Sequence, residues 1–416
     1  MGAAEETRRA ATARDALPRR FGAYHLFDRI GRGGMADIYL ARAHTEVGVG
    51  RRVVVKEILA DLSRDERFAR MLIEEAKLVC QLRHANVVQV FDLGREGERL
   101  FIAMEYVEGF DLNQLLRQVS QRRIGLPAQF ALFVVREILA ALDYAHRATT
   151  DAGVPIGVVH RDVSPSNVLI SFEGEVKLCD FGIAKAFGSS VPPGAERGSD
   201  DESTGERAKV AGKAAYMSPE QARGEEIDAR CDLFAAGIVL WELCAGRRLY
   251  RGDERQMLEL AREGAIPPLP ERGLPDTHVL QAILDRALAF DPAKRFPTAE
   301  AMLRALDEYA IGAKLFASQI RFGAFLSEHF EQDVVSVRRD RERAAEALAV
   351  GPPVQIQPVA PSAPPPAASP PASPPTVEPP PEPSRPSPLR IAAIAALLLC
   401  ITLVTAVTVR LLIDAL

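Results

Sequence analysis

The chain has 416 residues, 47% of them hydrophobic, which is enough to bury a large core in two or three domains. Its formal net charge of -5 argues against a nucleic-acid-binding protein, because no basic face follows from an acidic total. The five cysteines show no Cys-x-x-Cys spacing, which favours reduced thiols in a reducing compartment.

A glycine-rich turn between two strand-like runs is the first feature after a disordered N-terminal segment, 1–20. The turn, 31–36, reads Gly-Arg-Gly-Gly-Met-Ala, and the run 38–40 looks like a returning strand. Because glycines carry no Cβ, the backbone amides of such a turn can approach phosphate oxygens. A dinucleotide-binding fold needs a helix straight after the glycines, so the returning strand argues against that fold.

Further strands and a helix are predicted next. The valines 53–55 lead to Lys56 at the end of a β-branched run, and two more strands are expected at 87–93 and 100–106. Between Lys56 and the first of these two strands, the apolar residues of 65–82 recur with the period of an α-helix. The apolar face of this helix consists of Phe68, Leu72, Ala76 and Val79.

Three oxygen-bearing side chains in two neighbouring loops carry the strongest chemical signal. Asp162 and Asn167 follow a second predicted helix, 127–146, and Asp180 precedes a glycine shortly afterwards. Carboxylate and amide oxygens placed in this way could hold a metal-bound phosphate. Each residue alone would more often belong to ordinary turn chemistry, because Asp and Asn favour loops.

The loop 159–168, Val-His-Arg-Asp-Val-Ser-Pro-Ser-Asn-Val, followed by Asp180-Phe181-Gly182, resembles the catalytic and magnesium loops of bacterial eukaryotic-like (Hanks-type) serine/threonine protein kinases. The resemblance covers roughly 21–310 and implies an α+β, two-lobed protein kinase fold. A small β-rich lobe is expected at 21–106 and a large helical lobe at 107–310. The implied activity is transfer of a phosphoryl group from ATP to Ser/Thr hydroxyls of protein substrates in bacterial signalling, with Mg²⁺ or Mn²⁺.

The resemblance also assigns catalytic, metal-binding and nucleotide-binding roles. Asp162 is expected to act as the base, Asn167 and Asp180 to bind the metal, and Lys56 to hold ATP phosphates while paired with Glu75. Nucleotide contacts are expected along the glycine-rich turn, at the hinge between the lobes and around the adenine: Gly31, Arg32, Gly33, Gly34, Met35, Ala36, Ile38, Val54, Lys56, Met104, Glu105, Val107, Asp111 and Leu169.

Five further residues are expected to support the site. Asp232 should hold the backbone of the catalytic loop, and Glu220 should form a buried ion pair with Arg295. Arg161 precedes the catalytic Asp, which in this family marks enzymes that are activated by phosphorylation. Phe181 should belong to an apolar column that locks the active arrangement. The other members of this column are Val79, Val90 and His160.

Two positions depart from the family pattern. Ser164 stands where the Ser/Thr members carry a lysine, and Lys213 stands where they carry a threonine. We expect Lys213 to supply the positive charge that is missing at 164, and an exposed lysine without this role is an equal alternative. The same departures leave a smaller alternative of tyrosine specificity. They also leave open a membrane-tethered, pseudokinase-like scaffold that binds nucleotide or partners with little catalysis.

The segment 188–209 is rich in Ser, Gly, Pro and acidic residues. Ser203 and Thr204 are its candidate phosphorylation sites, because a phosphate there could pair with Arg161 and order the segment. The alternative is a flexible insert without a switch. Phosphorylation between two copies would involve a homodimer.

The C-terminal part of the chain is expected to form three regions. Residues 311–350 suggest helices that cap the larger lobe or pair with a second copy, and 351–389 form a Pro/Ala/Ser-rich linker. The predicted transmembrane helix, 390–410, contains an uncharged run that is about 28 Å long as a helix, close to the roughly 30 Å of a bilayer core. A short tail, 411–416, follows. This predicts a single-pass protein of the inner (cell) membrane with a cytoplasmic kinase domain.

Overall fold

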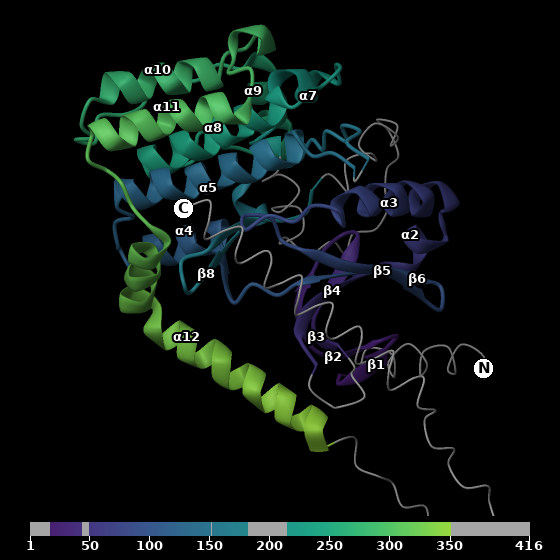
Figure 1. Cartoon of the computed structure of the whole chain (residues 1–416). Coiled ribbons are helices and arrows are strands. Elements are labelled where there is room, and N and C mark those ends of the chain that lie inside the picture. Colours follow the sequence, from purple (N-terminus) through teal and green to yellow (C-terminus); the bar gives the residue numbers. More distant parts are fainter. Residues whose placement is uncertain (1–16, 44–49, 151, 182–213, 351–416) are drawn as a thin grey trace, which may run out of the picture. The chain divides into compact units, whose positions relative to one another are not determined.

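The computed structural model describes residues 17–43, 50–150, 152–181 and 214–350. The chain divides into two units, and all described residues belong to the first of them. Within this unit, a sheet-rich lobe is followed along the chain by a lobe made mostly of helices (Figure 1).

No helix in the described ranges is both long enough and apolar enough to cross a membrane. The predicted linker, 351–389, the predicted transmembrane helix, 390–410, and the tail lie outside the described residues.

Six antiparallel strands form the sheet of the smaller lobe, in the order β1-β2-β3-β4-β6-β5. Apolar side chains such as Leu26 and Tyr39 fill a core on this sheet. The glycine-rich turn joins β2 to β3, and the amide of Gly33 donates to the carbonyl of Ala36 over 2.9 Å. The run 38–40 is therefore the return strand of a hairpin. The strands are β1 (Arg19–Phe21), β2 (Tyr24–Arg32), β3 (Ala36–Ala43), β4 (Arg52–Ile58), β5 (Val90–Glu96) and β6 (Arg99–Glu105).

One amphipathic helix, α3 (Glu66–Val79), packs beside this sheet after the short helix α2 (Ala60–Arg64). Its N-cap is Asp65, whose side chain accepts hydrogen bonds from the amides of Arg67 and Phe68. The predicted apolar face of α3 is buried, so the helical period of the sequence identified both the helix and its inner side.

A second, three-stranded sheet follows the hinge. Gly109 lies so close to the neighbouring strand that a Cβ would come 1.9 Å from the carbonyl oxygen of Ile170, so no larger residue fits there. Asp111 ends the first strand and caps the next helix by accepting a hydrogen bond of 2.7 Å from the amide of Gln114. These elements are β7 (Gly109–Asp111), α4 (Leu112–Gln121), η1 (Pro165–Asn167), β8 (Val168–Ser171) and β9 (Val176–Leu178).

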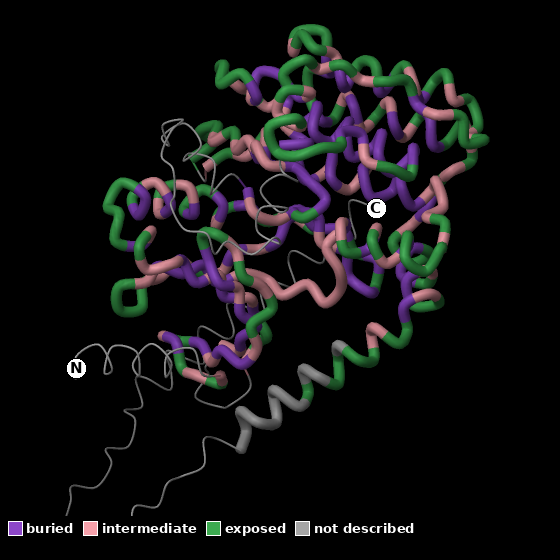
Figure 2. Tube along the Cα trace, turned by 180° about the vertical axis from the view of Figure 1, so that it is seen from behind, coloured by how far each residue is buried: buried purple, intermediate pink, exposed green. Residues whose placement is uncertain are grey.

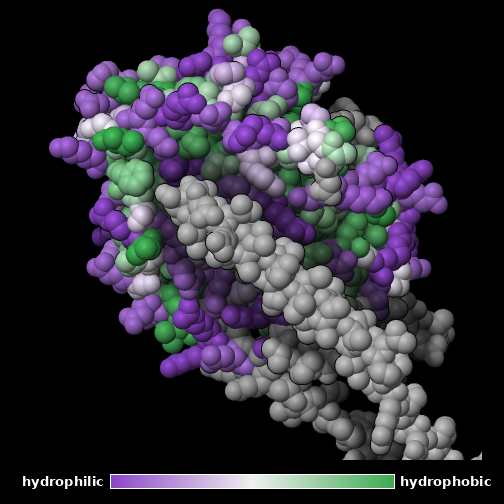
Figure 3. Space-filling view, in the orientation of Figure 1, coloured by the Kyte–Doolittle hydropathy of each residue, from purple (hydrophilic) through white to green (hydrophobic). Residues whose placement is uncertain are grey.

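The larger lobe is built around α8, which is apolar on all sides and buried along nearly its whole length. Helices α5 and α10 pack against α8, and α11 lies against both of them (Figure 1). Hydrophilic side chains cover most of the described surface in Figure 3, and apolar ones reach it in small groups. The helices are α5 (Ala128–His146), α7 (Pro219–Arg223), α8 (Arg230–Ala245), α9 (Glu254–Glu263), α10 (Thr277–Ala287), η3 (Pro292–Lys294), α11 (Ala299–Gly312) and α12 (Gln319–Val350).

The first turns of α12 cap the larger lobe. Phe322 and Phe330 are fully buried, and the Phe322 ring lies 5.1 Å from that of Phe130 on α5. The Phe330 ring lies 5.5 Å from that of Phe110. Beyond Phe330, where the helix is kinked, described side chains are exposed or half-buried (Figure 2). Of the two roles expected for 311–350, capping of the lobe is the one seen within this chain.

Candidate active site

A half-buried lysine and an aspartate meet at the boundary of the two lobes. Lys56 lies on the central strand β4, opposite Ile38 on one side and Ile102 on the other. Its ammonium nitrogen is 2.8 Å from Oδ1 of Asp180, which comes from the loop after β9. Asp180 has a left-handed backbone, with φ 58°, an unfavourable conformation that proteins retain mainly at functional sites.

The predicted ion pair between Lys56 and Glu75 is absent from the structure, although both residues are described. Glu75 is half-buried on α3; burial raises the pKa of its carboxyl group, and the nearby charge of Arg161 lowers it. The carboxylate beside Lys56 is that of Asp180, and Glu75 lies within electrostatic range of Arg161 in the catalytic loop. The spacing in the sequence identifies the side of α3 that carries Glu75 but cannot specify how far α3 lies from β4.

The base candidate and a metal-ligand candidate are bonded to each other. The amide nitrogen of Asn167 donates to the carbonyl oxygen of Asp162 over 2.8 Å and to its carboxylate over 3.1 Å. Asn167 is almost fully buried, and its amide oxygen remains for another ligand. Together with a carboxylate of Asp180, this set of oxygen donors fits Mg²⁺ or Mn²⁺.

His160 connects the catalytic loop to the loop that carries Asp180. Its Nε2 lies 2.9 Å from the carbonyl oxygen of Cys179, and its Nδ1 accepts a hydrogen bond of 3.2 Å from the amide of Asp162. Burial lowers the pKa of His160, against the opposite effect of three nearby aspartates, so the ring is neutral at pH 7. Its ring lies 4.5 Å from Phe181. The two other members of the predicted column, Val79 and Val90, belong to the same core as Phe181.

Asp232, at the start of α8, binds the backbone of the catalytic loop. Its carboxylate accepts hydrogen bonds of 2.8 and 2.7 Å from the amides of His160 and Arg161. This is the contact that the sequence predicts. His146, to which the sequence assigned no role, also lies 2.8 Å from this carboxylate through Nε2. A histidine at the end of an amphipathic helix gives no signal of such a contact before the fold is known.

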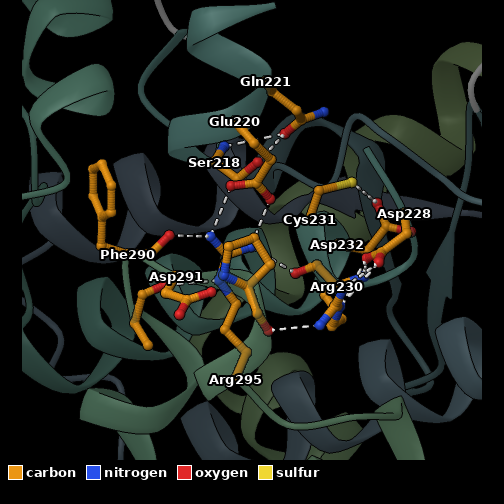
Figure 4. A network of polar contacts seen from close by, with 12 residues as sticks. Ser218, Glu220, Gln221, Asp228, Arg230, Cys231, Asp232, Phe290, Asp291 and Arg295 are labelled. Atoms are coloured by element: carbon orange, nitrogen blue, oxygen red, sulfur yellow. Dashed lines mark hydrogen bonds and ion pairs between the residues drawn. The ribbon is translucent and has the colours of Figure 1, made fainter. Parts of the chain in front are cut away.

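A buried ion pair holds α7 beside the catalytic loop. The guanidinium of Arg295 contacts both carboxylate oxygens of Glu220, over 2.6 and 2.8 Å (Figure 4). Burial raises the pKa of Glu220, but the hydrogen bonds and charge of Arg295, together with hydrogen bonds from Ser218 and the backbone, outweigh this effect, and the net pKa lies below the ordinary value. Next to it, Gln221 donates to the carbonyl oxygen of Arg161 over 3.0 Å. The predicted pair of Glu220 and Arg295 thus anchors α7 beside the catalytic loop.

Replacing Glu220 with Gln should cost roughly 3 kcal/mol of stability at pH 7, because the charge of Arg295 stays buried without its partner. Since the pKa of Glu220 is lowered on folding, its contribution is present above the unfolded pKa of about 4.5 and is lost as the pH falls. The difference in the free energy of unfolding between wild type and Glu220→Gln should therefore become smaller below about pH 4.5. Urea unfolding of both proteins at pH 7 and at about pH 3.5 measures this difference. An equal difference at the two pH values would contradict the negative charge assigned to Glu220.

The residues expected to contact ATP are distributed over both sheets and the hinge. Val54 and Met104 are neighbours on β4 and β6, and Asp111 pairs with Leu169 across β7 and β8. The hinge residue Glu105 forms an ion pair of 2.9 Å with Lys177 through its side chain. The remaining nucleotide-binding candidates are the turn residues 31–36, Ile38 on β3 and Val107 in the hinge.

Three predictions concern positions outside the described residues: Lys213 and the phosphorylation candidates Ser203 and Thr204. Ser164 is described and almost fully buried, and its hydroxyl lies 3.0 Å from that of Ser166. The idea that Lys213 compensates for Ser164 stays a prediction.

A family model described as "Protein kinase domain" matches residues 24–305. Tyrosine-protein kinase MasK of Myxococcus xanthus is 37% identical over 349 residues, which are 83% of this chain and 52% of that protein. Serine/threonine-protein kinase PknB of Mycobacterium leprae is 36% identical over 285 residues, covering 67% of this chain and 42% of that protein. The chain thus spans about half, or less, of these curated relatives.

Among solved structures, the chain is similar to the kinase domain of Mycobacterium tuberculosis PknI. The TM-score is 0.52 at 27% sequence identity, and the match covers 71% of this chain and 99% of that domain.

Proposed function

Because the chain belongs to the protein kinase family, we propose that it transfers the terminal phosphoryl group of ATP to Ser and Thr hydroxyls of proteins in bacterial signalling. One observation carries the proposal: Lys56 of the smaller lobe contacts Asp180, whose loop is bonded through His160 to the loop that holds Asp162 and Asn167. A fold retained only for scaffolding would not need these groups together.

Each residue has a role that its surroundings support. Asp162, held by Asn167, orients the acceptor hydroxyl and takes its proton. Lys56 contributes a positive charge for the phosphate groups. A divalent cation held by Asn167 and Asp180 would neutralise charge that develops on the transferred phosphoryl group. Positioning by these fixed groups accounts for most of the expected rate enhancement.

The acceptor specificity is proposed as Ser/Thr, and tyrosine is the second candidate. Several relatives, PknB of Mycobacterium leprae and PrkC of Bacillus subtilis among them, bear the name serine/threonine-protein kinase. MasK bears the name tyrosine-protein kinase, and Ser164 departs from the pattern of the Ser/Thr members. The test is transfer of radiolabelled phosphate from ATP by the full chain, followed by analysis of the modified amino acids. Labelled phosphotyrosine alone would overturn the Ser/Thr assignment, and no labelling at all would favour the scaffold.

We also propose that the run 391–409 anchors the chain in the inner membrane as a single span, with the kinase domain in the cytoplasm. The support is the hydropathy of the sequence, since an uncharged apolar run of this length matches a bilayer. The Pro-rich linker would keep catalytic domains close together near the membrane, which favours phosphorylation between copies in a homodimer. The full chain should stay in the membrane pellet after alkaline carbonate extraction, and its release into the supernatant would disprove the anchor.

A further inference from the structure

Two arginines from different elements of the larger lobe lie at the same face of α4. Arg248, in the loop after α8, donates to Oδ1 of Asn113 on α4 over 2.6 Å. Arg117 comes one helical turn after Asn113, so both lie on the same face of α4. Because Arg248 is bonded to Asn113 and Arg117 lies one turn further along the same face, the two guanidinium groups share one side of α4. Burial lowers the pKa of Arg248, and the positive charge of Arg117 acts in the same direction. Arg117 is exposed and forms no hydrogen bond or ion pair with any residue that the structure describes.

Within the described ranges, too little negative charge lies near this pair. Arg117 is the only charged residue of α4, and the loop 246–252 contains three arginines and no acidic residue. The acid that contacts Arg248 is Glu242, at 3.2 Å. Glu242 is buried and also accepts hydrogen bonds from the hydroxyl of Tyr216 and the amide of Leu249. It can neutralise at most one of the two arginines, so at least one positive charge remains for an external anion.

The location of the arginine pair, Arg117 and Arg248, connects it to the active site. The Arg248 guanidinium lies 5.6 Å from the centre of the Tyr216 ring. Tyr216 leads into α7, which is bonded through Gln221 to the carbonyl oxygen of Arg161, the neighbour of Asp162. Arg117 itself belongs to α4, whose N-cap, Asp111, is a nucleotide-binding candidate. The arginine pair therefore lies between the nucleotide side and the segment beside the catalytic loop.

We propose that the arginine pair is a specificity site for acidic residues of a protein substrate, and that its occupant is the run Asp200-Asp201-Glu202 of a second copy of this chain. This run directly precedes the phosphorylation candidates Ser203 and Thr204 in the sequence. The consecutive carboxylates of this run are opposite in charge to the arginine pair, and guanidinium groups bind carboxylates in a bidentate geometry. The inference rests on the proposed kinase activity and names the class of substrate for it.

The test uses the full chain as enzyme and a full-length Asp162→Asn copy as substrate, with phosphate at Ser203 and Thr204 measured by mass spectrometry. Neutralising 200–202 in the substrate copy as Asn-Asn-Gln should lower kcat/KM by about tenfold, as expected for two partly exposed charge pairs. Arg117→Glu in the enzyme should have a similar effect and leave the KM for ATP unchanged. The combination of Arg117→Glu with a substrate copy that carries Lys at 200–202 should restore transfer.

Arg321→Glu is the matched control, because Arg321 is exposed on α12 and its side chain forms no hydrogen bond or ion pair within the described part of the chain. This variant should discriminate between substrate copies as the wild type does. Equal transfer to acidic, neutral and basic copies, failure of the charge swap to restore transfer, or phosphate confined to other positions would each overturn the inference. If the wild type transfers no phosphate even to a general acceptor such as casein, the proposed function itself fails.

Discussion

Asp162→Asn should abolish most phosphoryl transfer, with kcat lowered by roughly 10²–10⁴-fold, the range typical for loss of a general base. The amide keeps the shape of the side chain but cannot accept a proton. The backbone carbonyl of Asp162 would still accept its hydrogen bond from Asn167, and His160 would still accept from the amide of residue 162, so the loop should stay folded. The rate of radiolabel transfer at saturating ATP measures the effect.

Measurements of ATP affinity and of stability distinguish loss of catalysis in Asp162→Asn from loss of structure. Asp162→Asn should bind ATP with metal within a few-fold of wild type, because Lys56, Asn167 and Asp180 are unchanged. Asp61→Asn is a matched control, since the Asp61 side chain is 99% exposed and lies far along the chain from the catalytic loop. If Asp162→Asn retains full activity, Asp162 is not the base and the proposed mechanism is wrong.

Local patterns in the sequence were sufficient to predict the parts of this fold that obey a short-range rule. The period of residues 65–82 identified α3 and its buried face, and the run 38–40 after the glycines identified the hairpin. The pair of Glu220 and Arg295 was also predictable from the family pattern, and the structure shows why both are needed: a charge buried this deeply requires a partner.

Other features depend on distances that no local pattern encodes. Glu75 lies on the expected helix, but the position of that helix against the sheet decides whether Glu75 reaches Lys56, and Asp180 contacts Lys56 instead. The contact of His146 with Asp232 requires the end of α5 to meet the start of α8. Likewise, apolar spacing in α12 could not distinguish packing on its own lobe from packing on a second copy, because both bury the same face.

Replacing both Phe322 and Phe330 with Ala should remove much of the stability of the catalytic unit. Each side chain is fully buried, and a Phe→Ala change in a core costs roughly 3–5 kcal/mol. The two rings contact different partners, Phe130 and Phe110, so their costs should nearly add. The sum is comparable with the roughly 5–15 kcal/mol that holds a typical domain folded.

Urea unfolding of the single and double variants measures these costs, with Phe316→Ala as the control. Phe316 is the same residue type in the connection between α11 and α12 but is 54% exposed, so its truncation should cost well under 2 kcal/mol. If Phe322→Ala is no more costly than Phe316→Ala, the first turns of α12 do not belong to the core. If Phe322→Ala costs more stability than Phe316→Ala, a fragment that ends at residue 305, where the family model ends, will lack the rings that cover α5. Its exposed aromatic face should make it aggregate.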